Sequence, residues 1–189
     1  MRNDRVMLLL FQISLAAFAL AALAGAVLFP ILCRDEQRLS VWEKVPRWKK
    51  PGAVLAVIVI LWCIPNLRPI LDPNSFLQPL LYPLAIVAAI LCIVYLDYLF
   101  SRAFAGFLIL LAHFLLKEAF AANVYPVSAV FALLLMMMGV IGIVISAKPY
   151  YLRDWIRFLF RKKAVRYGTC GYLAVLALSA VAMLIATLV

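Results

Sequence analysis

Six apolar segments, each close to the length needed to cross a membrane, constrain this chain most. A helix needs about 20 apolar residues to cross roughly 30 Å of bilayer hydrocarbon. Apolar residues make up 68% of the 189-residue sequence, more than a soluble domain could hide from water. The sequence therefore predicts an all-α integral membrane protein, a single polytopic domain over residues 1–189. Its expected spans are approximately 6–32, 53–71, 80–100, 103–122, 127–147 and 169–189.

The first segment resembles a secretory signal peptide. Basic Arg2 and Arg5 precede an apolar stretch, and residues 22–24 offer a plausible cleavage site. The apolar run nevertheless continues to Cys33, where a basic loop follows. We therefore expect the segment to be retained as a membrane span.

The second segment is the shortest, because residues 53–64 cover only about 18 Å of helix before Pro65. A kinked or re-entrant segment is one interpretation. The segment reaches residue 71 as a full span if Arg68 extends its long side chain toward the far interface. The distribution of charge favours the full span.

The basic residues are distributed unevenly between the loops. With six spans, residues 33–52, 97–102 and 148–168 share one side and hold 14 of the 18 Lys and Arg residues. The positive-inside rule then places these loops in the cytoplasm and both termini outside, in a cell (plasma or inner) membrane. The net charge of +10 is thereby explained by topology, and no nucleic-acid partner is expected.

The two large basic loops, 33–52 and 148–168, also resemble each other. At a constant offset of 119 residues, both leave the membrane as P-x-x-x-R-D, at Pro30 and at Pro149, and both enter the next span after a glycine. Either a duplication or similar composition explains the match. We expect the six helices to form three hairpins, and a duplication would make the first and last hairpins equivalent.

The second basic loop has the pattern of an amphipathic helix over residues 150–164. Leu152, Trp155, Ile156 and Leu159 share one face, at i, i+3, i+4 and i+7. We interpret the segment as a cytoplasmic interfacial helix whose cations contact anionic headgroups. A helix that only anchors the topology is the alternative. The candidate headgroup contacts are Arg153, Arg157, Arg161, Lys162 and Lys163.

The sequence lacks the motifs that membrane enzymes and cofactor sites require. It holds one histidine, which excludes H-E-x-x-H, and it has no G-x-S-x-G, Walker loop or G-x-G-x-x-G. Its four cysteines form no C-x-x-C pair, so neither a zinc site nor a disulfide framework is indicated. We expect a non-enzymatic protein without a cofactor.

Ionisable residues within the apolar sequence gather around the fourth span. At 100° per residue, Arg102, Gly106, His113 and Lys117 fall within about 60° of one another. Intramembrane ionisable groups often face other helices or water and often mark function. One interpretation is a proton or ion relay; the other is that these residues brace and orient the helix. The candidate intramembrane polar site comprises Asp97, Arg102, His113, Lys117 and Glu118.

Two functions are consistent with these patterns. The first is an accessory subunit or scaffold whose basic loops contact anionic lipid or a partner, with other membrane subunits or self-association as further possibilities. The alternative is a small oligomeric transporter or channel that uses His113 with Arg102 and Lys117. A polar cavity at His113 would favour transport, whereas dry packing around it would favour the scaffold.

Overall fold

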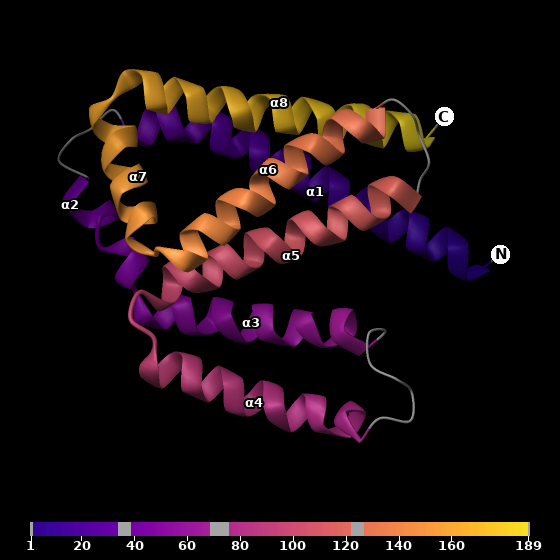
Figure 1. Ribbon diagram of the computed structural model, residues 1–189. Coiled ribbons are helices and arrows are strands. Elements are labelled where there is room, and N and C mark those ends of the chain that lie inside the picture. The colour runs from indigo at the N-terminus through magenta and orange to yellow at the C-terminus, as the bar shows by residue number, and fades with distance from the viewer. Residues whose placement is uncertain (1, 34–38, 69–75, 122–126, 189) are drawn as a thin grey trace. The chain divides into compact units, whose positions relative to one another are not determined.

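The computed structural model describes residues 2–33, 39–68, 76–121 and 127–188, with side chains from Leu9 onward except Leu77. All regular secondary structure in these ranges is helical (Figure 1). The helices are α1 (Arg2–Leu32), α2 (Leu39–Trp42), η2 (Val45–Arg47), α3 (Lys49–Leu67), α4 (Leu77–Tyr95), α5 (Leu99–Ala121), α6 (Val127–Ala147), α7 (Tyr150–Arg161) and α8 (Lys163–Leu188).

Six of these helices, α1, α3, α4, α5, α6 and α8, are long and apolar enough to cross a membrane, which confirms the six segments. The second segment forms α3, an unbroken helix of 19 residues and about 28 Å that continues past Pro65. It begins at Lys49, before the expected residue 53, because long basic side chains can extend from a helix end to water. Residues 69–71 lie outside the described ranges.

The other boundaries differ from the sequence prediction where polar residues continue a helix or a turn ends one. Helix α4 ends at Tyr95, not at residue 100, because Leu96 is extended and Tyr98 has a φ of 58°. Helix α8 begins at Lys163, six residues before the expected start. The apolar sequence indicates which residues can cross the hydrocarbon, whereas backbone hydrogen bonds can continue a helix into the polar interface. A helix can therefore be longer than its apolar segment.

The helices belong to two compact units. The terminal unit comprises Met1–Trp42, Ala112–Met138 and Trp155–Val189, and the central unit comprises Glu43–Leu111 and Gly139–Asp154. The terminal unit therefore holds α1, α8 and parts of α5, α6 and α7. The central unit holds α3, α4 and the remaining parts of α5, α6 and α7.

In the terminal unit, α1 and α8 lie side by side and antiparallel (Figure 1). Near one end Gln12 Nε2 donates to the Thr187 carbonyl at 3.3 Å. Near the other, Arg166 Nη1 donates to the Cys33 carbonyl at 2.9 Å. These two bonds are 21 residues apart on each helix, or about 32 Å, which matches the hydrocarbon thickness of a bilayer.

Small residues line the contact between α1 and α8. The register set by the two hydrogen bonds brings Ala19 opposite Ala180 and Ala22 opposite Ala177, and all four are buried. A Cβ added at Gly25 would lie 3.2 Å from Leu173 Cδ1. Small side chains let membrane helices approach closely, so this pair is tightly packed along its length.

In the central unit, α3 packs against α4, and glycines allow close contacts with α5. A Cβ added at Gly52 would lie 2.7 Å from the Phe100 backbone nitrogen, and one at Gly142 would lie 3.0 Å from the Ala105 carbonyl oxygen. Buried Ala56, Leu99 and Ala103 form a small core beside the first contact. The start of α3 and the start of α5 therefore touch through their backbones.

The expected three hairpins remain a prediction. The pairs that pack most extensively are α1 with α8 and α3 with α4, and neither is one of the three predicted hairpins. Three residues of the proposed repeat, Arg34, Asp35 and Arg38, lie outside the described ranges.

Candidate functional site

Most of the ionisable residues within α5 and just before it are exposed. Asp97, Arg102, His113 and Lys117 are exposed, and Glu118 is half-buried. Gly106, which the sequence placed on the same stripe, is half-buried, and a Cβ there would lie 3.1 Å from Val59 Cγ1 of α3. His113 is exposed, so protein atoms do not enclose it as the dry packing expected of a scaffold would.

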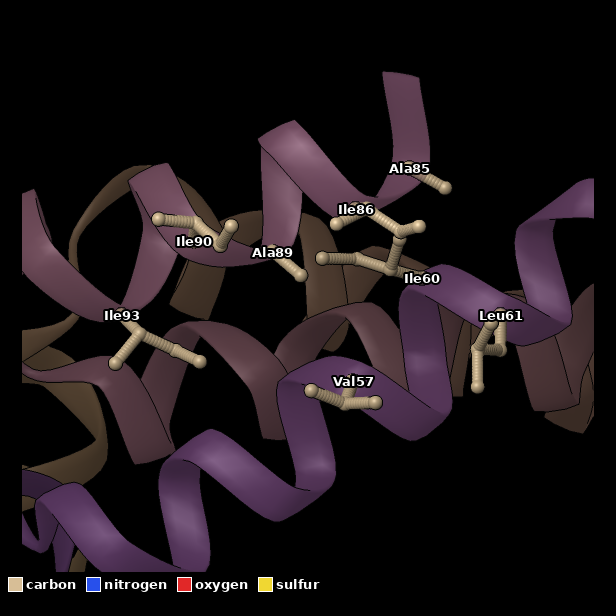
Figure 2. A pocket seen from close by; sticks show the side chains of 8 residues that line it. All are labelled: Val57, Ile60, Leu61, Ala85, Ile86, Ala89, Ile90 and Ile93. Atoms are coloured by element: carbon tan, nitrogen blue, oxygen red, sulfur yellow. The ribbon is translucent and has the colours of Figure 1, made fainter. Parts of the chain in front are cut away.

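A groove of about 250 Å³ lies in the central unit, between α3 and α4 (Figure 2). All its lining side chains are apolar, so it offers no group that could relay a proton. Figure 2 shows Ile60 directed toward α4, and Ala89 and Ile93 directed toward α3. The lining residues are Val57, Ile60 and Leu61 from α3, and Ala85, Ile86, Ala89, Ile90 and Ile93 from α4.

The three basic segments of the sequence meet at one end of the central unit. Arg47 Nη2 donates to the Tyr98 hydroxyl at 2.7 Å, and its guanidinium carbon lies 5.0 Å from the centre of that ring. The fully buried Ser101 donates through its hydroxyl to the Pro149 carbonyl at 3.1 Å. These contacts link the part of 33–52 that belongs to the central unit to 97–102, and link 97–102 to the first residues of 148–168.

Tyr98 has a left-handed backbone conformation, with a φ of 58°. This region is uncommon for an aromatic residue and costs about 1–2 kcal/mol. The conformation makes a tight turn between α4 and α5, and it holds the Tyr98 ring against Arg47. The turn therefore positions an aromatic ring and a cation together at this end of the unit.

Lys148 lies beside Tyr150 and Tyr151 at the junction of α6 and α7. Its Nζ is 5.5 Å from the centre of the Tyr151 ring. Hydrogen bonding to Tyr151 raises the pKa of Lys148 above its usual value, and the charge of the nearby tyrosines acts in the same direction. Lys148 therefore stays positively charged throughout the neutral range.

The terminal unit has a comparable basic end. The Arg166 guanidinium carbon lies 5.7 Å from the Tyr167 ring centre, and Lys162 Nζ lies 5.1 Å from the Phe158 ring centre. Arg166 also holds the Cys33 carbonyl. Burial raises the pKa of the Cys33 thiol, although the charge of Arg166 acts in the opposite direction. Cys33 is therefore a neutral thiol near pH 7.

The candidate headgroup residues of α7 are not equally available. Arg161, Lys162 and Lys163 are exposed, whereas Arg157 is half-buried. Arg153 is also half-buried and forms an ion pair with its neighbour Asp154 at 3.3 Å. The exposed cations at the end of α7 are thus better placed to meet a ligand than those at its start.

The apolar side chains of α7 pack on protein. Leu159 and Phe160 are buried with Cys33, and Trp155 and Ile156 pack against the same cluster. The cluster is also contacted by Phe29 of α1, Leu39 and Trp42 of α2, and Val165 of α8. Protein atoms therefore cover part of the face that the sequence assigned to the bilayer boundary.

Sequence reasoning missed Ser101 as well as Arg47, Lys148 and Arg166, whose cations contact aromatic rings. Tyrosines close in sequence to Lys148 and Arg166 were an available signal. Arg47 and Tyr98 are 51 residues apart, so no local pattern could have paired them.

No family model, curated protein or solved structure matches this chain. Within the described ranges, no three His, Cys, Asp or Glu side chains lie together as a metal site would require. The function must therefore be argued from the basic ends, the α5 residues and the groove.

Proposed function

We propose that the protein is a non-enzymatic integral membrane component, an accessory subunit or scaffold, whose basic ends, one in each unit, bind anionic lipid headgroups. An acidic surface on a partner protein would meet the same cations. The observation that supports this proposal is the contact between parts of all three basic segments within the central unit, through Arg47 with Tyr98 and Ser101 with Pro149.

Cations next to aromatic rings suit the boundary between lipid and water. Tyrosine and tryptophan are enriched at that boundary, and a lysine or arginine near an anionic surface contributes about 1 kcal/mol of attraction. Exposed Lys49 and Lys50 at the start of α3 add positive charge to the basic end of the central unit. Exposed Arg161, Lys162 and Lys163 do the same for the basic end of the terminal unit. The rings fix the depth of the helix ends, and the exposed cations attract the headgroups.

The proposal includes a membrane arrangement. Six helices span a plasma or inner membrane as three hairpins, α7 lies in the cytoplasmic interface, and both termini lie outside. Two observations support it: the bonds that tie α1 to α8 are about one hydrocarbon thickness apart, and the basic residue Arg166 forms the bond at the end away from the termini.

Transport through His113 is the alternative, and it requires a polar path to that side chain. The exposure of Arg102, His113 and Lys117 on α5 fits contact with another membrane subunit or a second copy of the chain at least as well. Burying such cations against a polar partner would reduce the cost of placing them in hydrocarbon.

Lipid selectivity in nanodiscs tests the main proposal. Spin-labelled phosphatidylglycerol should be enriched over spin-labelled phosphatidylcholine at the protein surface. Replacing Arg161, Lys162 and Lys163 with glutamine should reduce that enrichment at least about fivefold, since each cation contributes about 1 kcal/mol. Lys117→Gln, an exposed cation near the other end of α5, is the control and should leave it unchanged. Equal binding of both lipids to the unmodified protein would contradict the proposal.

A further inference from the structure

The α3/α4 groove faces away from the protein core and lacks polar groups. Its wall residues Val57, Ile86 and Ile90 are 37%, 61% and 56% exposed. A compact ligand binds tightly only where a few polar groups fix its orientation, and typical sites of that kind occupy about 300–1,000 Å³. At about 250 Å³ and without polar lining, this groove suits a flexible apolar chain better.

The cation of Arg68 lies beyond one end of the groove. The Arg68 guanidinium carbon lies 5.3 Å from the centre of the Tyr82 ring, and its Nη2 donates to the Tyr82 hydroxyl at 2.8 Å. Arg68 is seven residues beyond Leu61 on α3, and Tyr82 is three residues before Ala85 on α4. The pair therefore lies about 5–10 Å from the groove along the helices.

We propose that this groove binds one acyl chain of a phospholipid whose phosphate is held by Arg68. A guanidinium has five N–H donors in a planar fork that matches phosphate, and the hydrogen bond to Tyr82 uses one of its nitrogens. The Tyr82 ring fixes the position of that fork. The groove supplies apolar contact area for the chain, and Arg68 determines which end of the lipid lies beside it.

The dimensions argue against a second copy of the chain as the occupant. A helix with its side chains is about 10–12 Å across, whereas the groove holds about 250 Å³ between two packed helices. An acyl chain is one carbon wide and adapts to such a space. The inference does not depend on the basic ends, because α3 and α4 contribute all the residues that it uses.

Photo-crosslinking in nanodiscs tests the proposal. The probes are a phospholipid with a photoactivatable acyl chain and a diacylglycerol with the same chain, and labelled peptides are mapped by mass spectrometry. The phospholipid should label residues 57–61 and 85–93 more than the diacylglycerol does. Arg68→Gln should remove most of that difference, a loss of about fivefold for one cation at a lipid phosphate.

Two further variants address the chain. Ala89→Phe should fill the groove and abolish labelling of both helices by both probes, and Ala85→Leu serves the same purpose if the larger residue prevents folding. Ala182→Phe on the exposed side of α8 is the matched control and should leave labelling intact. Equal labelling by the two probes, unchanged labelling in a folded groove variant, or crosslinks to a second copy at these residues would each overturn the proposal.

Discussion

The two helix pairs, α1 with α8 and α3 with α4, differ in the shape of the side chains that lie between their helices. Alanines oppose each other along α1 and α8, and hydrogen bonds from Gln12 and Arg166 fix the register near both ends. Along α3 and α4, branched side chains such as Ile60 and Ile86 meet instead, and a groove remains between them. Arg68 and Tyr82 make a polar contact beyond that groove.

The difference follows from side-chain shape. Lipid tails are as apolar as leucine, so membrane helices gain by packing closely, and small residues allow the closest approach. Branched side chains fill space only when their shapes interlock, and any mismatch leaves a void. The alanine-lined pair is therefore the rigid part of the terminal unit, whereas the branched pair of the central unit retains room for a ligand.

An alanine-to-phenylalanine substitution in each helix pair tests this difference in packing most directly. Ala180→Phe should destabilise the protein by about 3 kcal/mol or more, because the alanine is fully buried and the register of the helices places it level with Ala19. Ala89→Phe should cost far less, because its ring enters the α3/α4 groove. Unfolding followed by circular dichroism in detergent measures both.

Ala182→Phe is the control for this experiment, since Ala182 is exposed on the same helix as Ala180. It should behave like the unmodified protein. If Ala180→Phe and Ala89→Phe destabilised the protein equally, the two contacts would not differ in packing.

The apolar spans could be read from the sequence, because length and hydropathy alone determine which helices can cross a bilayer. The contacts that make the two pairs different could not. Gly52 and Gly142 are unremarkable in the sequence, and only the approach of Phe100 and of Ala105 shows why a side chain would not fit. Such contacts depend on the packing of distant segments, which periodicity within one segment does not encode.

The candidate site was predictable only in part. Periodicity placed Arg102, His113 and Lys117 on one stripe of α5, and all three are exposed. Periodicity gives the direction in which a stripe of residues points around its own helix axis. It does not show which other helix or cavity lies on that side. The pairing of Arg47 with Tyr98 depends on the fold in the same way.

A smaller effect is expected from a glycine substitution that tests the close contact of α3 with α5 in the central unit. Gly52→Ala should destabilise the protein by about 1–3 kcal/mol, because the new Cβ would meet the Phe100 backbone. Gly168→Ala is the matched control, since nothing lies within 4 Å of a Cβ at that helical position. It should stabilise the protein by about 0.5–1 kcal/mol, the usual gain for alanine over glycine within a helix. Thermal unfolding that shifted in the same direction for both variants would contradict the close contact of α3 with α5.

The smallest effect is expected at His113, which belongs to neither pair. Its side chain is exposed on α5, so His113→Gln and His113→Leu should each change the free energy of unfolding by no more than about 0.6 kcal/mol, the average of a membrane side-chain hydrogen bond. Glutamine keeps part of the hydrogen-bonding capacity of histidine but cannot carry a titrating proton, and leucine has neither property.

Under the scaffold proposal, neither variant should alter lipid selectivity, and vesicles containing the unmodified protein should show no proton flux above that of empty vesicles. Under the transport alternative, the unmodified protein should show pH-dependent flux that both variants abolish while their unfolding curves remain unchanged. A pH-sensitive dye trapped in the vesicles measures this flux, and its loss in a fully stable glutamine variant would replace the scaffold with a transporter.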